Sequence, residues 1–233
     1  MALMNTEGVL FLLRWVHFFA GITWIGLLYY FNFVQTPFFA EVDPAVRSVA
    51  IQKLVPRALW WFRWGAMFTV LAGLGIYFTR LHQGYGGAYV WAISLGGLLG
   101  MIMWANVWFV IWPNQKVVIA STTQVAQGGQ PRPEAAASGR RAGLTSRTNV
   151  MFSIPMLFYM GASGHLPMLP FPRTTDAVVV TIIICAVVLA AVELNALVGT
   201  QGPTKKLLDS LPGTLAAGFV LSVIFYALFT LLG

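Results

Sequence analysis

The sequence predicts an all-α protein: a polytopic transmembrane helical bundle of about six spans. Hydrophobic residues make up 58% of the 233 residues and charged residues only 9%, a composition unlike that of a soluble domain. The apolar runs are long enough to cross a bilayer, which takes about 20 residues, and they lack the alternation of strands. No internal repeat is visible, so residues 1–233 are interpreted as a single integral membrane domain.

The spans follow from the apolar runs in chain order, and two segments between them differ in composition. Phe38–Arg57 mixes apolar and charged residues, which predicts a short amphipathic helix along the membrane interface. Gln127–Ser146 is rich in Gly, Pro, Ala and Arg, which predicts a flexible loop. The predicted spans are Val9–Val34, Ala58–Arg80, Gly87–Pro113, Thr148–His165, Thr174–Thr200 and Gly213–Leu232.

The basic residues indicate an orientation. Ten Lys and Arg lie in the first, third and fifth loops, whereas the second and fourth loops offer only Arg80 and Arg173. Because cytoplasmic loops carry the excess of Lys and Arg, we expect both termini on the non-cytoplasmic side of a bacterial inner membrane. The formal net charge of +7 is therefore a topology signal and does not indicate nucleic-acid binding.

The single cysteine, Cys185, limits the cofactor chemistry that the chain can support. One cysteine excludes a disulfide within the chain, a Cys-x-x-Cys zinc site and the Cys-x-x-Cys-His attachment of a c-type haem.

The first span contains a histidine. Arg14, His17, Gly21 and Trp24 recur at helical spacing along one stripe, with the small residue Ala20 beside it. An ionisable side chain within a membrane is costly, so it usually faces the bundle interior and a partner. Two interpretations follow: His17 is a haem or metal ligand, or it is hydrogen-bonded to a neighbouring helix.

In the predicted topology all three histidines lie toward the outer side. This arrangement allows a haem b with His17 and His165 as axial ligands and Arg14 paired with a propionate. It also allows a copper or zinc site with His82 as the third ligand, although the chain has no Met-rich or Cys-rich metal entry tract. Alternatively, His82 is a solvated loop residue and His165 an interfacial helix end.

A second polar layer is predicted near the cytoplasmic ends of the third and fifth spans. Glu193 and Asn195 occur late in the fifth span, and Asn106 occurs late in the third. A carboxyl group among apolar residues must be protonated, paired or next to water. These three residues are candidates for a proton relay. The alternative is a structural role for Glu193, either in a hydrogen bond to Asn106 or in a contact that caps Arg63.

Two longer motifs resemble a known family. The segments Asn106–Lys116 (NVWFVIWPNQK) and Ser146–His165 (SRTNVMFSIPMLFYMGASGH) are similar to signatures of the membrane domain of bacterial PuuD-type urate hydroxylases. Trp15–Gly26 is similar to the first helix of the same family, and also to membrane proteins of the copper-resistance and protoporphyrinogen-oxidase families. The resemblance implies a membrane redox domain that exchanges electrons with a cytochrome.

The chain also departs from that family. It has no haem-attachment motif of the family's C-terminal cytochrome c, and Trp60 and Gly65 stand where the family has His and Glu. These departures argue against urate oxidation itself, although an oxidoreductase role remains the leading hypothesis. We expect a membrane electron-transfer protein with haem b, lipid around it, and a separate cytochrome c or quinol as its redox partner. The rival hypothesis is a cofactor-free accessory or scaffold subunit of a larger membrane complex.

Overall fold

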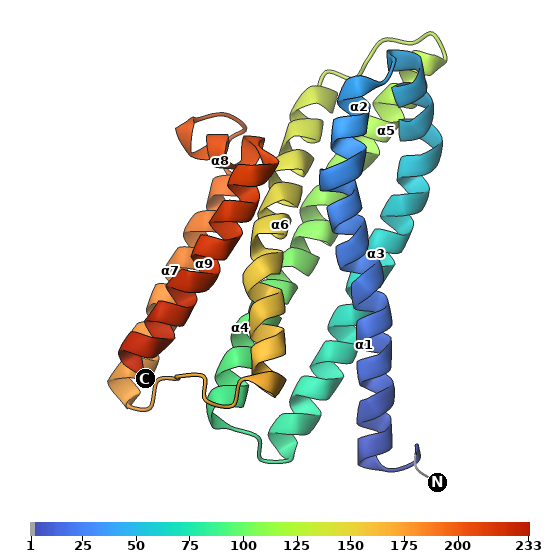
Figure 1. Cartoon of the computed structure of the whole chain (residues 1–233). Helices are drawn as coiled ribbons and strands as arrows, with labels where there is room; N and C mark the ends of the chain where they lie inside the picture. Colours follow the sequence, from blue (N-terminus) through green and yellow to red (C-terminus); the bar gives the residue numbers. More distant parts are fainter. Residues whose placement is uncertain (1–2) are drawn as a thin grey trace.

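A computed structural model describes residues 3–233, and these residues form a helical bundle without strands (Figure 1). The first, third and fifth connections lie at one end of the bundle, and the first helix begins and the last helix ends at the other. The elements are α1 (Thr6–Tyr29), the π-helical segment η1 (Tyr30–Gln35), α2 (Thr36–Glu41), α3 (Pro44–His82), α4 (Gly87–Ala105), the π-helical segment η2 (Asn106–Ile111), α5 (Trp112–Ala126), α6 (Ala135–His165), α7 (Thr175–Leu197), the 3₁₀ turn η3 (Pro203–Lys205), α8 (Lys206–Asp209) and α9 (Leu211–Leu232).

The predicted interfacial helix at Phe38–Arg57 is wrong. α1, η1 and α2 form one continuous helical segment, Thr6–Glu41, and α3 starts after a break of only two residues. Pro44 occupies the first turn of α3, where its missing N–H costs nothing. Good helix formers such as Ala, Leu, Arg and Lys then continue the helix. The amphipathic residues therefore extend two long helices beyond the expected spans.

The predicted loop at Gln127–Ser146 is too long. α5 ends at Ala126, and Gly128 follows with φ +84°, the left-handed conformation that commonly ends a helix. α6 already begins at Ala135, because three successive alanines favour helix and no proline interrupts the segment before Pro155. Only residues 127–134 form the connection.

α6 is the central helix of the bundle and packs against α4, α5, α7 and α9. Within residues 3–233, five helical segments are long and apolar enough to cross a membrane, and α6 is not among them. Its surface is largely covered by other helices, so it needs no apolar face toward lipid. The expected count of six spans therefore depends on α6. Its fully buried polar residues are Thr145, Thr148, Asn149 and Ser153.

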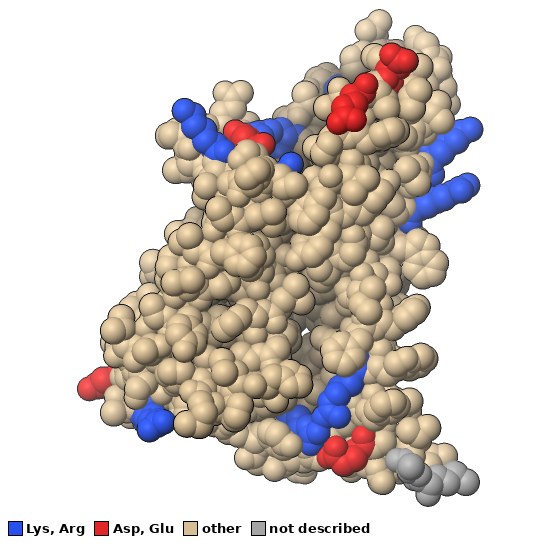
Figure 2. Space-filling model, viewed as in Figure 1, with Lys and Arg blue, Asp and Glu red and all other residues tan. Residues whose placement is uncertain are grey.

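The distribution of charge fits a membrane bundle. In Figure 2 the Lys, Arg, Asp and Glu side chains gather toward the two ends of the visible face, and its middle carries none. Many large apolar side chains are more than a third exposed, including Phe18, Ile22 and Ile183. Such a belt suits contact with a lipid bilayer.

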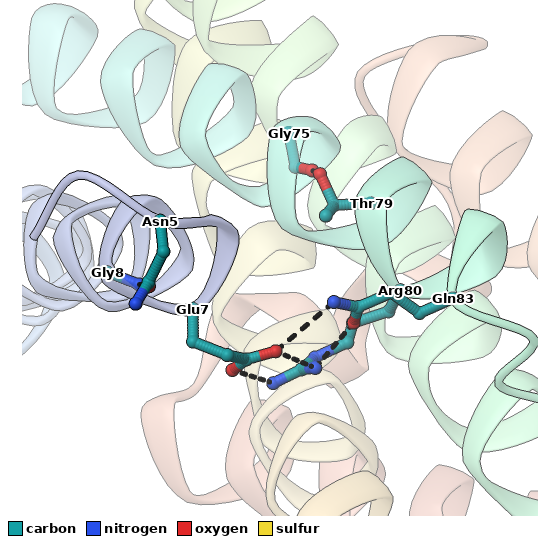
Figure 3. A network of polar contacts seen from close by, with 7 residues as sticks. All are labelled: Asn5, Glu7, Gly8, Gly75, Thr79, Arg80 and Gln83. Carbon is teal, nitrogen blue, oxygen red and sulfur yellow. Dashed lines mark hydrogen bonds and ion pairs between the residues drawn. The ribbon is translucent and has the colours of Figure 1, made fainter. Parts of the chain in front are cut away.

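α1 and α3 pack closely along their length. A Cβ added to Gly65 of α3 would lie 3.2 Å from the carbonyl oxygen of Ala20 and 3.1 Å from the backbone nitrogen of Trp24. Near the N-terminus, Arg80 Nη1 donates a hydrogen bond of 3.0 Å to Glu7 Oε1, and Gln83 Nε2 donates one of 3.1 Å to the same atom (Figure 3). These contacts join the first turn of α1 to the last turn of α3.

Candidate functional site

A cavity of about 240 Å³ lies near the end of the bundle opposite the termini. It receives side chains from η1, α2, α3, η2, α5, α6 and α8, and both longer family-like motifs contribute to it. Two phenylalanines, Phe31 and Phe62, form part of the wall with their rings edge to face at 5.4 Å. The polar lining residues are Asn32, Gln35, Thr36, Gln115, Arg140, Ser146, Arg147 and Asp209.

Two polar atoms on this cavity are buried without a hydrogen-bond partner among residues 3–233. They are Nη1 of Arg147 on α6 and Oε1 of Gln35 at the end of η1. The nearby acid is already engaged, because Asp209 Oδ1 accepts a hydrogen bond of 2.6 Å from Arg140 Nη1. A buried polar group without a partner is costly, so each of these atoms calls for a ligand or water. The cavity therefore has one surplus positive charge and one unused acceptor.

Both π-helical segments lie near this region. π-Helical turns are rare and frequently occur at functional positions. In η1, Asn32 Nδ2 donates to Leu28 O and to Ser146 Oγ, both at 2.8 Å. The bond to Ser146 holds η1 against α6, next to Gln35 and Arg147.

Asn106, the first residue of η2, is the centre of a buried polar network. Its Nδ2 donates to Asn149 Oδ1 at 2.9 Å and to Glu193 Oε2 at 3.1 Å, and Asn149 Nδ2 donates to Met103 O at 3.0 Å. The predicted hydrogen bond between Glu193 and Asn106 is thus present. Asn195 lies apart from this network, because its Nδ2 donates to Thr204 O at 3.3 Å. A role of these residues in proton transfer stays a prediction.

His17 faces α3. Its Nδ1 lies 2.8 Å from the carbonyl oxygen of Thr69, and its ring is close enough to Gly73 that an added Cβ there would lie 3.0 Å from His17 Cε1. A carbonyl only accepts, so Nδ1 carries the proton and a neutral ring keeps its lone pair on Nε2. This hydrogen bond matches the interpretation that His17 is hydrogen-bonded to a neighbouring helix. It leaves Nε2 free to bind a metal, as the haem-ligand or metal-ligand interpretation requires.

The other predicted cofactor residues are not joined to His17 by any hydrogen bond among residues 3–233. His165 ends α6 and is exposed, and His82 ends α3 and is exposed. Arg14 is half-buried on α1 without an ion pair in the described part of the chain. No group of three His, Cys, Asp or Glu side chains within residues 3–233 is arranged to hold a metal ion.

The two positions at which the chain departs from the related enzymes have structural roles here. The Trp60 side chain is 47% exposed on the outside of α3, where it contacts Trp61 edge to face at 4.9 Å. Gly65 forms the close crossing with α1, which leaves no room for a larger residue. Neither position contributes to the cavity.

Sequence reasoning missed Gln35 and Arg147 as site residues. Arg147 lies inside the second family-like motif, which was the available signal. The sequence assigns Arg147 only to the basic loop residues that indicate orientation, because its depth in the bundle depends on where α6 begins. Gln35 lacks any local signal, since a glutamine near the end of an apolar span is ordinary.

Comparison with known proteins gives one match. The family described as "Urate oxidase N-terminal" matches residues 79–223, more than half of the chain, including both longer motifs. No curated protein and no solved structure matches the chain. The match begins at the end of α3, so it leaves out Trp15–Gly26 and both departing positions. The chain belongs to the urate oxidase N-terminal family.

Proposed function

From this family membership, we propose that the chain is the membrane domain of an oxidoreductase system and that the Arg147 cavity binds its small organic substrate. The observation that carries the proposal is the pair of unpartnered buried atoms, Arg147 Nη1 and Gln35 Oε1, in one cavity. The family's name refers to urate oxidase, and a planar, weakly acidic heterocycle of that class suits this lining.

The chemistry of the lining supports such a ligand in three ways. Arg147 supplies a cation and a donor for an anionic ring oxygen. Gln35 supplies an acceptor for a ring N–H. Phe31 and Phe62 supply apolar walls for a flat ring, and typical ligand sites combine such walls with a few polar groups.

Substrate binding is tested with urate and the purified protein in nanodiscs, by isothermal titration. Arg147→Gln is expected to weaken binding by about tenfold or more, because a charged hydrogen bond contributes roughly 1.5–3 kcal/mol. The matched control is Arg141→Gln, an exposed arginine on the same helix that does not line the cavity. Equal losses in both variants, or no urate binding by the wild type, would contradict the proposal.

We further propose haem b as the electron carrier. His17 and His165 would be its axial ligands and Arg14 a propionate partner, and the bound group would supply one-electron transfer to a separate cytochrome c or quinol. The support is the His17–Thr69 hydrogen bond, since metal-binding histidines usually donate their second N–H to a carbonyl or carboxylate. His17 would bind the haem iron through Nε2, and the exposed His165 would supply the second histidine.

The haem and the substrate bind at separate sites in this proposal. Gln35 lies 18 residues beyond His17 in one continuous helical segment, about 27 Å along its axis. A haem at His17 would not touch a ligand in the cavity. Glu193, held by Asn106, would accept or release protons near the cavity end.

A pyridine-haemochrome spectrum tests the cofactor, and His17→Ala and His165→Ala test its ligands. Loss of the haem or a high-spin spectrum in both variants is expected. If the wild type has no Soret band and His17→Ala is tolerated, the rival role as an accessory subunit is favoured, and partners should then co-purify in mild detergent. Urate titration distinguishes the substrate proposal from the haem proposal, because it measures ligand binding in the Arg147 cavity and does not depend on a haem.

A further inference from the structure

Two cations share one indole ring on the flank of the bundle. Cζ of Arg63 on α3 lies 3.6 Å from the ring centre of Trp112 and 5.3 Å from that of Trp108. Nζ of Lys116 on α5 lies 5.6 Å from the ring centre of Trp112. We call these four residues the Arg63 cluster. None of them lines the Arg147 cavity.

The cluster has no counter-ion in the described chain. Arg63 uses only Nε, which donates to Leu59 O at 3.3 Å, and its terminal nitrogens make no hydrogen bond within residues 3–233. Lys116 makes neither a hydrogen bond nor an ion pair there, and the two ion pairs present involve other arginines. Like charges held close together in a medium of low dielectric constant repel. Two neighbouring cations therefore lack the anion that would balance them.

Along α3, the exposed surface around the cluster changes from tryptophan side chains to purely apolar side chains. Trp60 and Trp61, 47% and 57% exposed, precede Arg63 in the helix, and exposed tryptophans mark the headgroup level of a membrane. Phe68 and Leu71, 51% and 55% exposed, follow it toward the middle of the bundle, and Phe109 of η2 is 68% exposed. The cations thus lie between a tryptophan belt and an apolar surface.

We propose that the Arg63 cluster binds the headgroup phosphate of an anionic phospholipid, with the acyl chains lying over the apolar surface. The free guanidinium nitrogens hydrogen-bond the phosphate oxygens, and the indole of Trp112 holds the guanidinium in a fixed plane. Lys116 adds a second charge. The headgroup of a zwitterionic lipid contains a cation, which Arg63 and Lys116 would repel. The site therefore prefers an anionic headgroup.

Native mass spectrometry of the detergent-purified chain tests this site, with phosphatidylglycerol and phosphatidylcholine of equal chain length as competing lipids. The wild type is expected to retain phosphatidylglycerol preferentially. Arg63→Gln and Lys116→Gln should each reduce the preference about fivefold, the factor equivalent to ~1 kcal/mol for a basic residue at a membrane surface. Arg57→Gln is the control, because Arg57 is an exposed arginine of the same helix outside the cluster.

Equal retention of the two lipids by the wild type would overturn the proposal, as would an equal loss in Arg57→Gln. Displacement of the lipid by inorganic phosphate would also overturn it, since it would indicate a site for a free anion. If Arg63→Gln does not fold, Lys116→Gln decides the question, because its side chain is exposed. The urate titration is independent of this result.

Discussion

α6 and α9 lie very close together at Gly218, so Gly218→Ala should destabilise the bundle. An added Cβ would lie 2.8 Å from the carbonyl oxygen of Met151 and 2.5 Å from Cδ1 of Ile154. Ile154 Cδ1 is the far end of a flexible side chain, but the Met151 carbonyl and Ile154 Cβ, at 3.2 Å, are fixed to the central helix. The helices would have to separate by about 0.6 Å, the difference between 2.8 Å and an ordinary contact of 3.4 Å.

The cost in stability comes from the apolar contacts that this separation of α6 and α9 weakens. Phe225 and Phe229 of α9 are buried against the core, and a gap of this size forfeits roughly a quarter to a half of each contact energy at the interface. Overpacking typically costs about 1–3 kcal/mol, and replacing glycine by alanine in a helix returns up to about 1 kcal/mol. We expect a net loss of about 1–2 kcal/mol in the free energy of unfolding.

Thermal unfolding in detergent, followed by circular dichroism, measures this loss. Gly161→Ala is the matched control, since a Cβ at Gly161 of α6 meets no atom within 4 Å. It should leave stability unchanged or raise it by up to about 1 kcal/mol. A Gly218→Ala variant as stable as Gly161→Ala would refute the reasoning about the α6–α9 contact.

Three further predictions concern the polar network, a buried lysine and the orientation. Asn106→Leu removes the donor to Glu193 and should cost about 1–3 kcal/mol in thermal unfolding; an unchanged midpoint would contradict a structural role for this bond. Burial lowers the pKa of Lys205 below 10.5, so the native state loses its proton before the unfolded state does. The free energy of unfolding should then rise as the pH approaches 10.5, and Lys205→Met should abolish that rise in denaturant titrations at alkaline pH. A cysteine placed at Gln130, with Cys185→Ser, should react with an impermeant maleimide only after cells are permeabilised, and labelling of intact cells would invert the proposed topology.

Composition and hydropathy alone predict the class of the molecule and most of its helices. Composition and long apolar runs are sufficient, because a chain in lipid must satisfy every backbone hydrogen bond internally and helices do so locally. The stripe through His17 was predicted correctly as a contact face, since its small residues admit a neighbouring helix. The family-like motifs were identified correctly over Asn106–Lys116 and Ser146–His165.

The places where polar groups of distant segments meet depend on helix packing, which no local sequence pattern encodes. Gln35 and Arg147 are more than 100 residues apart, and they share one cavity because α6 runs through the centre of the bundle. Helix ends outside the membrane were also beyond sequence reasoning, since water satisfies the backbone there and hydropathy no longer marks a boundary. Arg63 and Lys116 are brought over one ring by the packing of α3 on α5, a contact that no local pattern contains.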